Sequence, residues 1–137
     1  MMARPLARLL VVDDEPDVRD MIASLLAEEG YAVATASDGE SALRAIAAAP
    51  FDLATMDLRM PGMSGRELLV AARAIDPGLA AIVISGYATP EEADDCRARG
   101  AACVVQKPFD VSTLLDEVAR ALAARRGADT AAPDSRE

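Results

Sequence analysis

The sequence predicts an α/β fold, a doubly wound five-stranded parallel sheet in which the strands have the order 2-1-3-4-5. Short apolar runs alternate five times with segments of helical periodicity along the 137 residues, which is typical of successive βα units. The first, third and fourth runs are almost continuously apolar, as in central strands, whereas the second alternates, as in an edge strand. With 52% apolar and 27% charged residues, the chain has the composition of a globular domain.

The first two βα units carry clear start and stop signals. Residues 9–12 form a continuous apolar strand, and apolar residues at helical spacing follow it as far as Gly30, which closes the helix. Residues 31–36 form the alternating second strand. The second helix begins around Asp38 and ends at Pro50, because proline cannot continue a helix.

The third unit contains a buried strand and a well-marked helix start. Residues 53–56 form the strand, which ends at Asp57. Ser64 and Glu67 have the spacing of a capping box, in which each side chain binds the other residue's backbone N–H. The helix that follows ends before Pro77.

The fourth unit has the same organisation but a weaker helix. Residues 81–84 form the strand, which ends at Ser85. Thr89 and Glu92 form a second capping box. The helix runs to about Arg99 and offers few apolar residues, so we expect weak docking and low local stability.

The fifth unit completes the fold. Residues 103–106 form the last strand, which ends at Lys107, and Asp110 caps the last helix. Beyond this helix the sequence becomes polar and rich in Ala, Pro and Asp, which predicts disorder. We therefore divide the chain into an N-terminal extension (1–6), one domain (7–126) and a disordered tail (127–137).

Composition excludes several functional classes. The net charge of −9 argues against direct binding to nucleic acid or to an anionic membrane. The chain has no His, which excludes a Ser-His-Asp triad, a His-based zinc site and a phosphohistidine on this chain. No apolar run approaches a membrane span or an export signal, so we expect a cytoplasmic protein. Cys96 and Cys103 are expected to be reduced core thiols.

The polar residues at the strand ends predict one functional site. In open parallel sheets, ligands bind beyond the carboxyl ends of the strands. These ends carry three acids, one hydroxyl and the only Lys of the chain, namely Asp13, Asp14, Asp57, Ser85 and Lys107. Three adjacent carboxylates repel one another, and a divalent cation with one ammonium group would balance their charge. Oxygen ligands favour Mg²⁺, and a carboxylate beside it can form an aspartyl phosphate.

Four motifs in this order resemble the receiver domain of two-component response regulators. The resemblance covers about residues 7–126 and implies the flavodoxin-like (CheY-like) version of the predicted (βα)5 fold. The motifs are Asp13-Asp14, the run from Asp57 through Arg59 and Pro61 to Gly65, Ser85-Gly86 and Lys107-Pro108-Phe109.

The resemblance implies a role for each residue of the site. Asp57 would accept a phosphoryl group from a phosphohistidine on a histidine kinase or a His-containing phosphotransfer protein. Asp14, Asp57 and the Arg59 backbone carbonyl would bind Mg²⁺ directly, and Asp13 would bind it through water. Lys107 would pair with the phosphoryl oxygens after a cis peptide bond to the following proline, and Ser85 would donate a hydrogen bond to one of them.

The sequence departs from the family at one position that bears on switching. The family often carries Tyr or Phe three residues before the Lys, and here this residue is Val104. An aromatic rotamer switch there is impossible. Tyr87 is a candidate gate in its place and, with Arg59, would control water access and the lifetime of the acyl phosphate. We also expect phosphorylation to reposition the fourth helix, the fifth strand and the last helix.

We therefore expect a phosphoacceptor signalling protein with slow autodephosphorylation, not an enzyme. It would signal to a downstream target protein, and the last two helices with the fifth strand offer a surface for a homodimer. Three alternatives stay open: a fragment of a larger regulator, an unphosphorylated adaptor with a receiver fold, and a phosphatase with an Asp nucleophile. Phosphatases of that kind usually carry a second Asp where this chain has Arg59, which counts against the third alternative.

Overall fold

A computed structural model describes residues 7–134 and the side chains of residues 7–125. It contains one five-stranded sheet with the order β2-β1-β3-β4-β5, in which every pair of neighbours is parallel. The prediction of fold class and strand order is confirmed. The strands are β1 (Arg8–Val12), β2 (Ala32–Ala36), β3 (Leu53–Asp57), β4 (Ala80–Ser85) and β5 (Cys103–Gln106).

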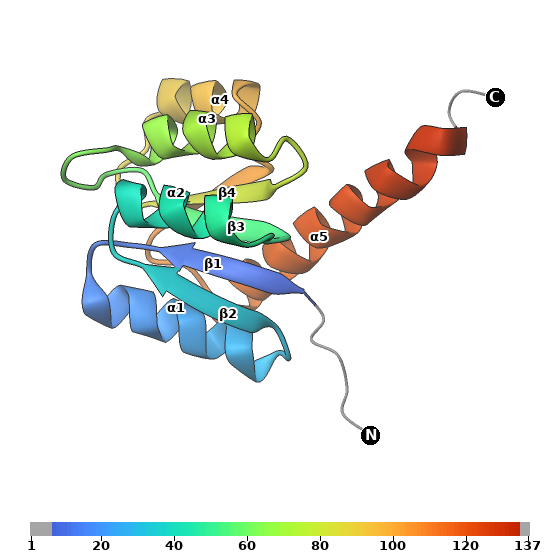
Figure 1. The fold of residues 1–137 in the computed structure, drawn as a ribbon. Helices are drawn as coiled ribbons and strands as arrows, with labels where there is room; N and C mark the ends of the chain where they lie inside the picture. Colours follow the sequence, from blue (N-terminus) through green and yellow to red (C-terminus); the bar gives the residue numbers. More distant parts are fainter. Residues whose placement is uncertain (1–6, 135–137) are drawn as a thin grey trace.

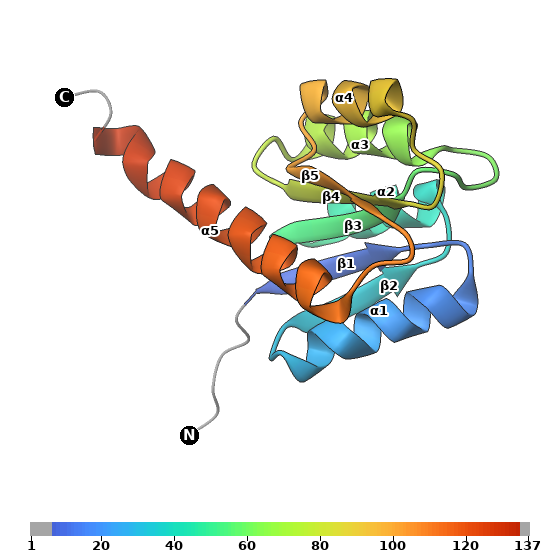
Figure 2. The same ribbon diagram turned by 180° about the vertical axis from the view of Figure 1, so that it is seen from behind.

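Helices cover both faces of this sheet. Helices α1 and α5 lie on one face, and α2, α3 and α4 lie on the other (Figure 1, Figure 2). Among the described residues, no helix is both long and apolar enough to cross a membrane. The helices are α1 (Pro16–Glu28), α2 (Gly39–Ala48), α3 (Gly65–Ile75), α4 (Pro90–Ala98) and α5 (Val111–Asp134).

The sheet separates two apolar cores, because alternate residues of a strand point to opposite faces. In β1, Leu10 and Val12 pack with residues of α2 and α3, whereas Leu9 and Val11 pack with residues of α1 and α5. All five residues of β3 are buried, as expected for the central strand. Near-continuous apolar runs are therefore the mark of the central strands here.

Two of the predicted helix starts and one predicted stop act as expected. Ser64 and Thr89 each open a helix with a complete capping box. Gly30 follows α1 with φ of 99°, a left-handed conformation that favours glycine, and its N–H donates to the Ala27 carbonyl at 3.0 Å.

Helix α4 is weakly buried, as its composition predicts. Of its residues only Cys96 is buried, and the helix has acidic residues in its first turn. Cys96 and Cys103 are both free thiols, and burial raises the pKa of Cys103 to about 11.

The end of α5 differs from the prediction of disorder from residue 127. The helix continues to Asp134. Ala has the highest helix propensity, and extending an existing helix costs less than nucleating one, so the Ala residues at 128, 131 and 132 continue α5. The predicted extension (1–6) and the last three residues of the predicted tail lie outside the described residues, and the three-part division of the chain stays a prediction.

Candidate functional site

The carboxyl ends of the strands bring Lys107 and two aspartates together. Lys107 Nζ donates to Asp57 Oδ2 at 3.0 Å and to Asp13 Oδ2 at 3.3 Å. These three residues follow or end strands β5, β3 and β1, which lie in one sheet. The Lys107 N–H donates to the Ser85 carbonyl at 2.9 Å, which extends the pairing of β5 with β4 as far as the lysine. Strand pairing therefore carries the ammonium group to the site.

Backbone hydrogen bonds hold the remaining oxygens of the two aspartates. Asp13 Oδ1 accepts the Glu15 N–H at 2.9 Å, and Asp57 Oδ1 accepts the Arg59 N–H at 3.1 Å. Asp13 is 1% exposed and Asp57 is 7% exposed. Each carboxylate is thus bound at both oxygens, so its orientation is fixed before any ligand binds.

Asp14 completes a cluster of three acids. One carboxylate oxygen from each of Asp13, Asp14 and Asp57 lies within 4.8 Å of the others, and Asp14 is half-buried. Three carboxylates and one ammonium group leave a local charge of about −2, which a divalent cation would neutralise. Closely spaced carboxylate oxygens beside an open cavity are the donors that Mg²⁺ prefers, so the residues fit this ion. The Arg59 backbone carbonyl as a further ligand stays a prediction.

Two opposing effects act on the Lys107 ammonium group. Burial by itself would lower the pKa of Lys107, because it removes water from the charged form. The hydrogen bond and charge of Asp57, together with those of Asp13, act in the opposite direction, and the pKa of Lys107 lies above its ordinary value. The lysine is therefore fully charged near neutral pH, as a partner for anionic oxygens must be.

Ser85 ends strand β4 beside Asp57. It is 1% exposed, and its hydroxyl oxygen accepts the Tyr87 N–H at 3.2 Å. Ser85, Asp57 and Lys107 line one cavity of about 280 Å³, together with Asp14, Glu15, Arg59, Gly86 and Tyr87. Every predicted site residue except Asp13 lines this cavity, and the two hydrogen bonds of Lys107 connect Asp13 to it.

The two residues discussed for switching have different surroundings. Val104 is half-buried in β5, paired with Val83 in β4. Tyr87 is 81% exposed, and its predicted role as a gate stays a prediction. The peptide bond between Lys107 and Pro108 is cis, as the resemblance implies.

Gly65 has a role that the sequence did not reveal. A Cβ atom at this position would overlap the Asp57 carbonyl oxygen and would lie 2.7 Å from Leu58 Cα. The Gly65 N–H also donates to the Leu58 carbonyl at 2.9 Å. Absence of a side chain therefore lets α3 begin directly against the end of the strand that carries Asp57.

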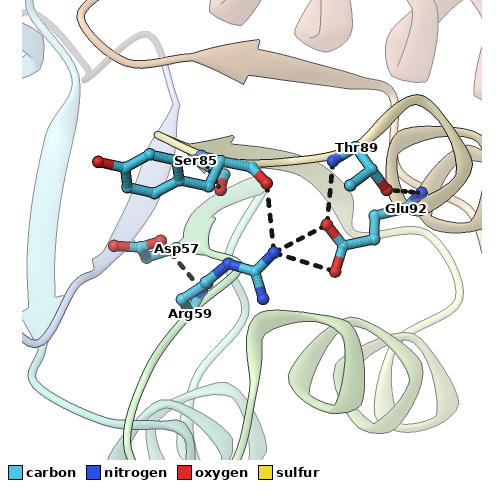
Figure 3. A network of polar contacts seen from close by, with 6 residues as sticks. Asp57, Arg59, Ser85, Thr89 and Glu92 are labelled. Atoms are coloured by element: carbon cyan, nitrogen blue, oxygen red, sulfur yellow. Dashed lines mark hydrogen bonds and ion pairs between the residues drawn. The ribbon is translucent and has the colours of Figure 1, made fainter.

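Arg59 has a partner that the sequence also did not reveal. Its side chain forms an ion pair with Glu92, a residue predicted only to cap α4 (Figure 3). The two residues are 33 positions apart, and no local spacing rule could have paired them.

Comparison with known proteins identifies the family. Residues 9–119 match the family described as the response regulator receiver domain. The chain belongs to this family. It is 33% identical to the crystal structure of a CheY-like response regulator receiver domain protein from Methanospirillum hungatei, with a TM-score of 0.85 over 89% of this chain and 98% of that one. The chain is thus a receiver domain of the response regulators of two-component systems, a signalling domain and not a member of a conventional enzyme family.

Relatives of this receiver domain differ in length. The response regulator receiver protein CpdR of Brucella abortus is 35% identical, over 85% of this chain and 98% of its own. A response regulator receiver protein of Anaeromyxobacter is 39% identical over 80% of this chain, but the chain spans only 46% of its length. Receiver domains of this kind therefore occur both alone and as part of longer proteins.

Proposed function

We propose that this receiver domain is a phosphoryl switch in which Asp57 is the acceptor. The phosphoryl group would come from a phosphohistidine of a histidine kinase or a His-containing phosphotransfer protein, since the chain itself has no His. The observation that carries the proposal is the position of Lys107 Nζ, within 3.0 Å of Asp57 and 3.3 Å of Asp13 in an acidic, solvent-accessible cavity. A fixed ammonium group beside a fixed carboxylate is suited to receive the charge of a phosphoryl group.

We propose that Asp14, Asp57 and the Arg59 backbone carbonyl would hold Mg²⁺ directly and that Asp13 would hold it through water. The ion would supply positive charge beside the transferred phosphoryl oxygens. The closeness of the three carboxylates supports this assignment, because they create the charge that a divalent cation neutralises.

The protein's own residues would orient and read the phosphoryl group. Asp57 Oδ1 accepts the Arg59 N–H, and Oδ2 is the oxygen beside the Lys107 ammonium group, which can take up charge of the phosphoryl group. Oδ2 would therefore attack phosphorus while the P–N bond to the donor histidine breaks and the imidazole leaves. The Lys107 ammonium group would then form an ion pair with the new phosphoryl oxygens. Ser85 would rotate its hydroxyl hydrogen toward one of them while its oxygen keeps the Tyr87 N–H. Arg59 and Tyr87 line the same cavity, so they would limit water access and keep autodephosphorylation slow.

The output would be a change in protein contacts in the cytoplasm, not catalysis on a small substrate. The weak burial of α4 supports a movable element next to Ser85. We propose that α4, β5 and α5 form the surface that a target protein or a second copy of the chain recognises after phosphorylation. Hydrogen exchange with and without beryllofluoride should change in residues 86–106, and unchanged exchange there would contradict this output.

A labelling experiment tests the acceptor. A small phosphodonor such as acetyl phosphate should give a Mg²⁺-dependent, hydroxylamine-labile label on the protein but not on Asp57→Asn. Glu40→Gln, an exposed change on α2, is the matched control and should label normally. Absence of the label would favour an unphosphorylated adaptor. Sustained turnover of a phosphate ester would favour the phosphatase instead.

A further inference from the structure

The Arg59 side chain connects the loop after β3 to the start of helix α4. Its Nη2 nitrogen donates to both carboxylate oxygens of Glu92, at 2.9 and 3.1 Å, and to the Tyr87 carbonyl oxygen at 3.2 Å. Figure 3 shows the guanidinium group directed toward Glu92 and away from the Asp57 carboxylate. One side chain thus binds both the loop before α4 and the first turn of α4.

The Glu92 carboxylate is held in place without Arg59. Its Oε1 atom accepts the Thr89 N–H at 3.0 Å, and the Thr89 hydroxyl accepts the Glu92 N–H at 3.1 Å. The hydrogen bond from Thr89 lowers the pKa of Glu92, and the charge of Arg59 acts in the same direction. Capping therefore presents Glu92 as a fixed anion that Arg59 can bind or leave.

Helix α3 carries the same cap without an arginine. Glu67 Oε1 accepts the Ser64 N–H at 2.9 Å, and the Ser64 hydroxyl accepts the Glu67 N–H at 3.2 Å. Among the described residues, no ion pair involves Glu67. The fold of a capped helix therefore does not require the Arg59 contact, and Glu67 is a matched control for Glu92.

Helix α4 depends on such contacts more than the other helices do. Cys96 is its one buried residue. A second ion pair joins α4 to α3, between Arg66 Nη1 and Asp95 Oδ2 at 3.2 Å. The side chains of Arg59 and Arg66 are each 54% exposed. Exposed ion pairs are weak and readily exchanged for a stronger partner.

Arg59 already lies at the edge of the site where such a partner would form. Arg59 lines the same cavity as Asp57 and Lys107, and its backbone N–H donates to Asp57 Oδ1. A phosphoryl group adds negative charge and three strong acceptor oxygens. It is therefore a stronger partner for the planar guanidinium group of Arg59 than the Glu92 carboxylate, which already accepts another hydrogen bond.

We infer that Glu92 is a positioning residue that holds Arg59 on α4 while Asp57 is unmodified, and that a phosphoryl group on Asp57 takes Arg59 away from it. The inference rests on the proposed phosphorylation of Asp57. In the unmodified state Arg59 fixes the Tyr87 carbonyl and the first turn of α4. In the modified state Arg59 binds the phosphoryl oxygens, and this loop and turn are released.

If Glu92 and the phosphoryl group compete for Arg59, the free energy of the Arg59–Glu92 ion pair must be given up when the phosphoryl group binds. Removing the Glu92 charge should therefore raise the affinity for a phosphoryl analogue. The test is a titration of the full chain with beryllofluoride in the presence of Mg²⁺, followed by amide NMR. Glu92→Gln keeps an acceptor for the Thr89 N–H but loses the ion pair, and it should bind beryllofluoride about two- to fivefold more tightly. Glu67→Gln loses the same charge from the other cap and should leave the affinity unchanged.

A double variant separates exchange of Arg59 from a general loss of negative charge. In an Arg59→Gln background, Glu92→Gln should give no further gain. Without beryllofluoride, Glu92→Gln should also speed hydrogen exchange in residues 86–92, as the ligand does in the wild-type protein. These results together would support the inference.

Three results would overturn it: an unchanged or weaker affinity of Glu92→Gln, an equal gain in Glu67→Gln, or a gain that persists without Arg59. If the wild-type protein neither binds beryllofluoride nor labels on Asp57, the proposed function fails and the inference fails with it. Binding by the wild-type protein with any of the three contrary results removes only the role of Glu92.

Discussion

Replacing Asp14 by Asn should stabilise the protein in the absence of divalent cations. Asp14 has two acidic neighbours, Asp13 and Asp57, with oxygens within 4.8 Å. At this distance two unit charges repel by roughly 3.5 kcal/mol at an effective dielectric of 20 and by about 0.9 kcal/mol in bulk water. Lys107 forms its hydrogen bonds with the other two aspartates, so its attraction falls mainly on them.

The exposure of Asp14 sets the size of the expected gain. Because the side chain is half-buried, solvent screens a large part of the repulsion. We expect the free energy of unfolding of Asp14→Asn to rise by about 1–3 kcal/mol, which raises Tm by roughly 3–10 °C for a domain of this size. Asp20→Asn, an exposed change on the α1 helix that follows Asp14, should alter stability by less than about 0.5 kcal/mol.

The measurement is thermal unfolding followed by circular dichroism at a wavelength that reports helix content, once in EDTA and once in millimolar Mg²⁺. Mg²⁺ should stabilise the wild-type protein, because a ligand that binds only the folded state raises its stability. Mg²⁺ should stabilise Asp14→Asn much less. The difference in Tm between the two proteins should therefore shrink or change sign when Mg²⁺ is added. A Tm of Asp14→Asn below that of the wild-type protein in EDTA would refute the reasoning.

Three further predictions concern other parts of the site and the core. Lys107→Arg keeps the charge but not the compact ammonium group, so beryllofluoride should change hydrogen exchange in α4 less than in the wild-type protein. Gly65→Ala should lower the free energy of unfolding in urea by about 1–3 kcal/mol through its clash with Asp57, whereas Gly78→Ala, at a position with only ordinary contacts, should change it little. The pKa of Cys103, raised by burial to about 11 from 9.0, predicts slow alkylation at neutral pH. Equal alkylation rates for Cys103 and a free thiol would contradict the raised pKa. The contribution of this thiol to the free energy of unfolding should be complete below pH 9.0 and be lost as the pH rises through about 11.

The site could be predicted from the sequence because its residues lie at strand ends. A run such as residues 53–56 marks a central strand by its apolar character alone, and parallel topology then places Asp57 at the same edge as Asp13 and Lys107. Both steps depend on local pattern and on a general rule of parallel sheets. The sequence thus predicts that Lys107 and the two aspartates lie at one edge of the sheet, and the structure adds the distances between them.

Contacts between loops could not be predicted in this way. The pairing of Arg59 with Glu92 depends on the paths of two loops that strand periodicity does not determine. The approach of Gly65 to Asp57 depends on how closely α3 packs against β3, and a glycine in a turn motif has the same sequence appearance with or without that contact.

The positions of β3 and β5 in the sheet give the two key residues unequal mechanical stiffness. Strand β3 pairs with β1 and with β4, and all its residues are buried, so Asp57 is attached to the stiffest part of the sheet. Strand β5 has four residues, pairs with β4 alone in the described sheet and is only partly buried, so Lys107 is attached to a more compliant edge strand. A change in the charge of Asp57 is therefore expected to displace Lys107 and its strand more than Asp57, so that the acceptor serves as a fixed reference and the edge strand carries the motion.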